Sequence, residues 1–110
     1  MNPQLAYKQR QYRSSARSYQ DNQILSMSST QLILKVYDIA IVSVKKGDHL
    51  RAHRAIQELI NSLDFEQGEI PRGLFRLYQF CQNSIRTKKY DDAIKILEQL
   101  RSTWAEAFRL

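Results

Sequence analysis

LILKVYDIAIVSV, residues 32–44, is too apolar for an ordinary surface helix. At roughly 100° per residue, apolar side chains cover most of its circumference and the charged ones gather on one side. The broad apolar face is formed by Ile33, Val36, Tyr37, Ala40, Ile41 and Val44. Ile39 and Val42 fall on or beside the charged side, which holds Lys35, Asp38, Lys45 and Lys46. A helix that is apolar nearly all round is buried on more than one face, so the pattern predicts neighbours within the fold and apolar surface for a partner.

Capping signals set the limits of this helix. Ser28 and Gln31 have the spacing of a capping box, so the helix is expected to begin near residue 29. Gly47 is expected to stop it, and Asp48 is placed to cap the next helix. A connection this short makes the two helices antiparallel neighbours.

Further amphipathic segments follow along the chain. The polar linker DFEQGE precedes Pro71, which suits a first helical position, and Asp91 or Asp92 is expected to cap the last helix. The four helices are expected near residues 29–46, 49–63, 71–88 and 91–108. The core stripe expected for the third helix is Leu74, Leu77, Tyr78, Cys81 and Ile85. With short loops and no β signal of comparable strength, the sequence predicts an all-α fold.

The expected architecture is an antiparallel up-down-up-down four-helix bundle over residues 29–110, preceded by a mobile N-terminal arm, residues 1–28. A chain of 110 residues is the size of one domain. No apolar run approaches the ~20 residues of a membrane span, and the first residues lack the apolar segment of a secretory signal. We therefore expect a cytoplasmic protein with no membrane insertion. Cys81, the single cysteine, is expected to pack in the core.

The formal net charge of +6 raises the possibility of nucleic-acid binding. Half of the excess lies on residues 1–31, which carry four basic side chains and one acidic one. Basic side chains in the remainder are mostly interleaved with Asp and Glu, which is typical of a solvated face. The distribution argues against nucleic acid as the partner.

The N-terminal arm is rich in Gln, Arg, Ser and Asn, so it cannot bury enough apolar surface to fold alone. Aromatic and aliphatic side chains nevertheless punctuate it, and such side chains can anchor a mobile arm to a groove. The candidate anchors are Tyr12, Tyr19, Ile24 and Leu25. A disordered tail with incidental tyrosines is the alternative interpretation.

No catalytic constellation is recognisable in the sequence. It has no Gly-rich phosphate loop, no Cys/His cluster and no nucleophile elbow. His49 and His53 have i, i+4 spacing, but further ligands of a zinc site are missing, so we expect neither a metal nor a cofactor. Asp38 is embedded in the apolar helix, and because Lys35 and Lys45 flank its side, we expect it to have solvent or ion-pair partners. We expect the protein not to be an enzyme.

An excess of apolar side chains remains beside the predicted core stripes. They are Ile39, Val42, Phe75, Phe80, Ile94 and Ile96. At least one of the two phenylalanines is expected to pack against a neighbouring helix. The excess fits a bundle whose grooves receive an amphipathic helix of a partner, and it would equally serve a homodimer.

Four strings together resemble the family of the flagellar secretion chaperone FliS. QLILKVYDIAI resembles the family's ELLLMLYDGAI, and HRAIQELINSLD resembles its KAQNIIQELNSSLD. GEIPRGLFRLYQF is similar to GEIARNLxxLYDYM, and DDAIKILEQLRSTWAEAF is similar to DxxxLEEVxxLLxxLRxAWxEA. The resemblance covers about residues 29–108. Departures are Ile39, where the family has Gly after Tyr-Asp, and CQNSIRTKKY, which lacks the family's RRLxxAN.

The resemblance implies a four-helix export chaperone that binds the disordered C-terminal region of flagellin in the cytoplasm. Such a chaperone prevents premature polymerisation and presents flagellin to the type III export apparatus, so the flagellar export gate is a further candidate partner. In the family the N-terminal segment can occupy part of the client surface. Two alternatives stay open: a helical nucleic-acid-binding module that uses the Arg/Tyr tail, and a homodimeric assembly adaptor. The chain itself is expected to be a monomer or a homodimer.

Overall fold

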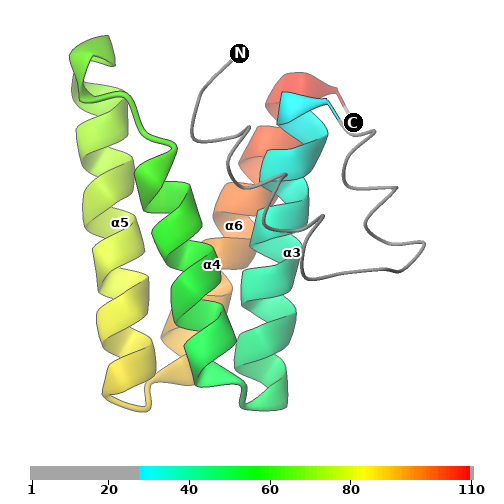
Figure 1. Ribbon diagram of the computed structural model, residues 1–110, viewed down its shortest axis with the longest axis vertical. Coiled ribbons are helices and arrows are strands. Elements are labelled where there is room, and N and C mark those ends of the chain that lie inside the picture. The colour runs from blue at the N-terminus through cyan, green and yellow to red at the C-terminus, as the bar shows by residue number, and fades with distance from the viewer. Residues whose placement is uncertain (1–27, 110) are drawn as a thin grey trace, which may run out of the picture.

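The computed structural model describes residues 28–109, which fold as four helices and one short 3-10 turn. The elements are α3 (Ser29–Lys46), α4 (His49–Asn61), η1 (Phe65–Gln67), α5 (Glu69–Arg86) and α6 (Tyr90–Phe108). Figure 1 shows the helices running alternately up and down, with α6 behind α4 and against both α3 and α5. The prediction of an all-α four-helix bundle is confirmed. The predicted arm lies almost wholly outside the described residues.

The limits of α3 follow from its capping residues, as predicted. The Ser28 side chain accepts a hydrogen bond from the backbone N–H of Gln31, and the Gln31 side chain accepts one from Ser28. At the other end Gly47 adopts a left-handed conformation with φ 78°, which favours glycine. Asp48 then accepts a hydrogen bond from the backbone N–H of Arg51 and caps α4.

The other helix ends differ from the sequence-based expectations. α4 ends at Asn61, where the Ser62 hydroxyl donates to the carbonyl of Leu59. α5 already begins at Glu69, so Pro71 lies inside its first turn, where its missing N–H leaves no bond unmade. The prediction that an aspartate caps α6 was wrong: α6 begins at Tyr90, and the two aspartates lie in its first turn, where negative charge favours the helix dipole.

The core lies between the four helices and draws on each of them. Its largest fully buried side chains are Tyr37, Tyr78, Ile56, Leu97 and Cys81. α3 contributes Val36, Tyr37, Ala40, Ile41 and Val44 to the core cluster. Burial raises the pKa of the Cys81 thiol to about 12, so the thiol stays protonated and unreactive. This position confirms that Cys81 is a packing residue.

A polar contact inside the core ties three helices together. The hydroxyls of Tyr37 and Tyr78 are 2.5 Å apart, and Trp104 Nε1 donates to the Tyr37 hydroxyl at 3.0 Å. Burial raises the pKa of both tyrosines, so both hydroxyls remain protonated and can share hydrogen bonds. Because these polar atoms need each other, they fix how α3, α5 and α6 are positioned.

Candidate partner-binding surface

The structure separates the predicted partner-binding residues into three groups. Tyr12, Tyr19, Ile24 and Leu25 lie outside the described residues. Ile39, Ile94 and Ile96 are half-buried and pack against the core cluster, so only part of each side chain is available to a partner. Val42 and Phe80 are exposed, by 45% and 47%.

Phe75, the remaining predicted residue, already has an aromatic neighbour. Its ring meets that of Phe65 in η1 edge-on, with centroids 5.5 Å apart and an interplanar angle of 85°. This edge-to-face geometry is a favourable aromatic contact. Phe75 is therefore half-buried and packs the α4–α5 connection against α5, whereas the expectation was a contact with a neighbouring helix of the bundle.

An exposed apolar stripe runs along α5. Ile70, Leu77 and Phe80 are 74%, 38% and 47% exposed, and Gly73 lies between them on the same helical face. The side chain of Gln82 hydrogen-bonds to α4, so it marks the flank of α5 that faces α4. The core-facing Cys81 lies between this flank and the exposed stripe. The stripe therefore faces away from α4, on the flank that α5 turns toward α6.

The facing flank of α6 is also apolar. Glu98 and Arg101 bond to α3, so the opposite flank, with Ile96 and Leu100, faces α5. Phe80 lies six residues before Arg86, and Ile96 six residues after Tyr90, so the two are level along the antiparallel helices. We call Ile70, Leu77, Phe80, Ile96 and Leu100 the α5–α6 apolar surface.

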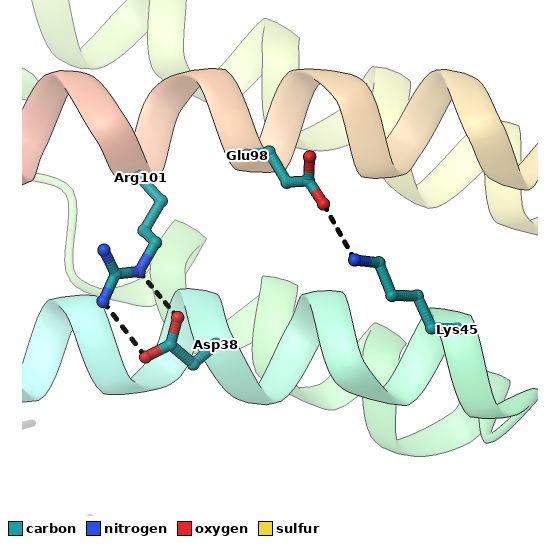
Figure 2. A network of polar contacts seen from close by, with 4 residues as sticks. All are labelled: Asp38, Lys45, Glu98 and Arg101. Atoms are coloured by element: carbon teal, nitrogen blue, oxygen red, sulfur yellow. Dashed lines mark hydrogen bonds and ion pairs between the residues drawn. The ribbon is translucent and has the colours of Figure 1, made fainter.

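Two ion pairs, in contrast, join α3 to α6. Figure 2 shows Arg101 reaching Asp38 with two nitrogens, Nε at 2.6 Å from Oδ1 and Nη2 at 3.3 Å from Oδ2. Lys45 Nζ lies 3.0 Å from Glu98 Oε1. The bond with Asp38 raises the pKa of Arg101. Val42 borders these ion pairs and does not adjoin the α5–α6 apolar surface.

Asp38 is thus partly solvent-exposed, as one of the two expectations required, and its ion-pair partner is Arg101 of α6 instead of Lys35 or Lys45. Sequence analysis also missed Leu77 and Ile70 as exposed residues. It placed Leu77 in the core stripe. In the structure the core-facing side of α5 is instead formed by Pro71, Tyr78, Cys81 and Ile85, and Leu77 lies beside that face. The apolar pattern of α5 alone does not show this rotation, because it depends on how the helices pack against each other.

The two histidines do not form a metal site in the structure. His49 stacks on Tyr90, with ring centroids 4.6 Å apart, and this contact joins the first turns of α4 and α6. Within residues 28–109 no group of three or more His, Cys, Asp or Glu side chains could hold a metal ion. In the same range no helix is long and apolar enough to cross a membrane.

Comparison with known protein families identifies a match over much of the chain. A family model described as flagellar protein FliS matches residues 44–109, more than half of the chain. The matched range includes α4, α5 and α6 and thus the whole α5–α6 apolar surface, whereas most of α3 precedes it. No curated protein and no solved structure matches the chain. The matched range confirms the resemblance seen in the sequence, and the chain belongs to the FliS family of flagellar proteins.

Proposed function

We propose that this protein is a cytoplasmic export chaperone that binds the disordered C-terminal region of flagellin. In this role it keeps flagellin from polymerising prematurely and delivers it to the flagellar type III export apparatus. The observation that carries the proposal is the α5–α6 apolar surface, where Ile70, Leu77 and Phe80 are exposed on a member of the FliS family. The protein acts by binding and not by catalysis.

The size of the apolar surface suits a client that folds as it binds. Ordering a disordered segment costs about 2–5 kcal/mol. Fully burying an Ile, Leu or Phe side chain contributes ~1.5–3 kcal/mol. Scaled by the exposed fractions of 74%, 38% and 47%, covering Ile70, Leu77 and Phe80 contributes about 2–5 kcal/mol. Burial of these three chaperone side chains thus offsets the free-energy cost of ordering the client. Burial of the client's own apolar face then provides the net binding free energy.

The N-terminal arm has a role in the same proposal. Tyr12, Tyr19, Ile24 and Leu25 cover apolar surface of the bundle while no client is present, so client and arm compete. Truncation of residues 1–27 is then expected to raise client affinity, because the competing segment is gone. Unchanged or weaker affinity of the truncated protein would contradict this role.

Matched alanine variants test where the client binds. Leu77→Ala and Phe80→Ala each remove an exposed side chain of the α5–α6 apolar surface, and we expect each to weaken binding of a flagellin C-terminal peptide at least about fivefold. Leu50→Ala is the control, since Leu50 is 62% exposed on α4 and does not belong to that surface. Calorimetry gives the affinities, and thermal unfolding verifies that the variants fold. Equal losses for Leu50→Ala and Leu77→Ala would contradict the proposed location.

Val42→Ala separates a second contribution. If the client also wraps over α3, Val42→Ala weakens binding although Val42 is remote from the α5–α6 apolar surface.

A homodimer that uses the α5–α6 apolar surface would instead show a mass in light scattering that rises with protein concentration and falls in Phe80→Ala.

A further inference from the structure

A polar groove of about 460 Å³ lies between α4 and α5. His53, Arg54 and Gln57 of α4 line it together with Gln82 and Arg86 of α5. It holds two guanidinium groups and no carboxylate. It is a shallow depression open to solvent, so an occupant would lie along the surface of α4 and α5.

Neither arginine of the groove has an acidic partner within residues 28–109. The ion pairs of that range join Arg72 to Glu69, Arg101 to Asp38 and Lys45 to Glu98. Burial lowers the pKa of His53, and the positive charge of Arg86 lowers it further. The groove therefore has a positive potential that no carboxylate in this range neutralises by direct pairing.

Two side-chain amides in the lining of the groove are hydrogen-bonded to each other. Gln82 Nε2 donates to the backbone carbonyl of His53 and to Gln57 Oε1, both at 3.4 Å, and Gln57 Nε2 donates to Asn61 Oδ1 at 3.0 Å. Bonds of 3.4 Å are long, so a stronger acceptor can readily replace them. The carboxylate of a partner is such an acceptor, because it forms charge-assisted bonds to guanidinium groups and amides.

We propose that this groove docks an acidic segment of a partner protein, with its carboxylates paired to Arg54 and Arg86. The site is separate from the α5–α6 apolar surface, so this proposal goes beyond flagellin binding. Paired carboxylates fit better than a nucleic-acid backbone, because residues 28–110 carry thirteen basic and ten acidic side chains. Gln82 and Arg86 belong to CQNSIRTKKY, where the sequence departs from the FliS pattern quoted above.

The test uses a fluorescent, alanine-based helical peptide with two glutamates at i and i+4, and the same peptide with glutamines. Anisotropy with the full-length protein measures the affinities, and amide chemical shifts locate the peptide. We expect the glutamate peptide to bind, to shift His53, Gln57 and Gln82, and to bind at least about tenfold more tightly than the glutamine peptide.

Two double variants remove the same charge from the same two helices. Arg54→Gln with Arg86→Gln empties the groove of guanidinium groups, and binding of the glutamate peptide is expected to fall about tenfold or more. Arg51→Gln with Arg76→Gln is the control, because neither of these arginines lines the groove, and its affinity should stay within about twofold of the wild type.

Three results would overturn the proposal. Equal losses in the two double variants would mean that net charge alone attracts the peptide. Equal binding of the glutamate and glutamine peptides would exclude carboxylate recognition. If oligothymidylate binds and the groove variant abolishes that binding but spares the glutamate peptide, the groove is a phosphate site. Affinity for the flagellin peptide is expected to be the same in both double variants, so this test does not depend on the proposed function.

Discussion

Replacing Tyr37 or Tyr78 by phenylalanine removes one hydroxyl from the polar contact inside the core and leaves the ring in place. The two hydroxyls are 2.5 Å apart, and the residues are 0% and 2% exposed, so water cannot substitute for the missing partner. A net hydrogen bond contributes about 0.5–1.5 kcal/mol, and a buried hydroxyl without a partner costs ~1–3 kcal/mol. In Tyr78→Phe, Trp104 Nε1 still donates to the surviving Tyr37 hydroxyl, so we expect a loss of about 1 kcal/mol. In Tyr37→Phe both the Tyr78 hydroxyl and the Trp104 N–H lose a partner, so we expect a loss of about 2 kcal/mol.

The double variant is the decisive member of this series. Once both hydroxyls are absent, neither hydroxyl is left unsatisfied and only the part-buried Trp104 N–H has lost its acceptor. The loss is therefore expected to be no greater than that of Tyr37→Phe, about 2 kcal/mol. The two substitutions should therefore show a coupling energy of about 1 kcal/mol. Urea unfolding followed by Trp104 fluorescence and circular dichroism gives the free energies, provided that the m-values agree.

Tyr37→Phe combined with Leu50→Ala serves as the control cycle, because Leu50 is exposed on α4 and does not touch the polar contact. That pair should be additive within about 0.3–0.5 kcal/mol. If Tyr37→Phe and Tyr78→Phe are additive within the same limit, the hydroxyls do not stabilise each other and the account of the core is wrong.

Three further changes have expected outcomes. Gly73→Ala should raise the free energy of unfolding by ~0.5–1 kcal/mol, because no atom lies within 4 Å of the added Cβ in this helix; a lower melting temperature would contradict this. Asp38→Asn should cost at most ~1 kcal/mol, since both it and Arg101 are more than a third exposed, and the loss should shrink at high salt. The pKa of His53, followed by NMR, should lie below the ordinary histidine value and rise in Arg86→Gln. His53 binds the proton more readily in the unfolded protein, so the free energy of unfolding falls as the pH drops through the ordinary histidine pKa. An unshifted pKa of His53 would contradict the effect of burial and of Arg86.

Local signals explain why α3 could be predicted almost to the residue. Its capping box, its glycine stop and its apolar face all lie within the segment itself, so the sequence contains the whole argument. The capping residue of α6 was predicted wrongly. Asp91 and Asp92 both fit the local pattern of a cap, but the structure uses neither of them in that role. Helix ends are where such local patterns compete most evenly.

Contacts between distant segments were beyond the reach of pattern analysis. Asp38 and Arg101 are 63 residues apart, and Trp104 reaches Tyr37 over 67 residues. Nothing in either local sequence shows which helix flank turns toward the other. For the same reason Leu77 was assigned to the core, although the orientation of α5 places it on the apolar surface.

The sequence predicted an excess of apolar side chains beside the core, and the structure exposes only some of them. An excess of apolar side chains was visible in the sequence, and Phe80 is exposed as that interpretation requires. Ile39, Ile94 and Ile96 pack against the core, and Phe75 packs against Phe65. Burial depends on how four helices rotate against each other, which the hydrophobic pattern of one helix does not determine.

Titration of the full-length protein with a flagellin C-terminal peptide tests the central claim most directly. Circular dichroism reports the helicity of the peptide, and calorimetry gives affinity and stoichiometry. The account predicts tight one-to-one binding with a gain of helix and a negative heat-capacity change, because apolar surface is buried as the client folds. No binding at micromolar concentrations, or binding without a gain of helix, would contradict it.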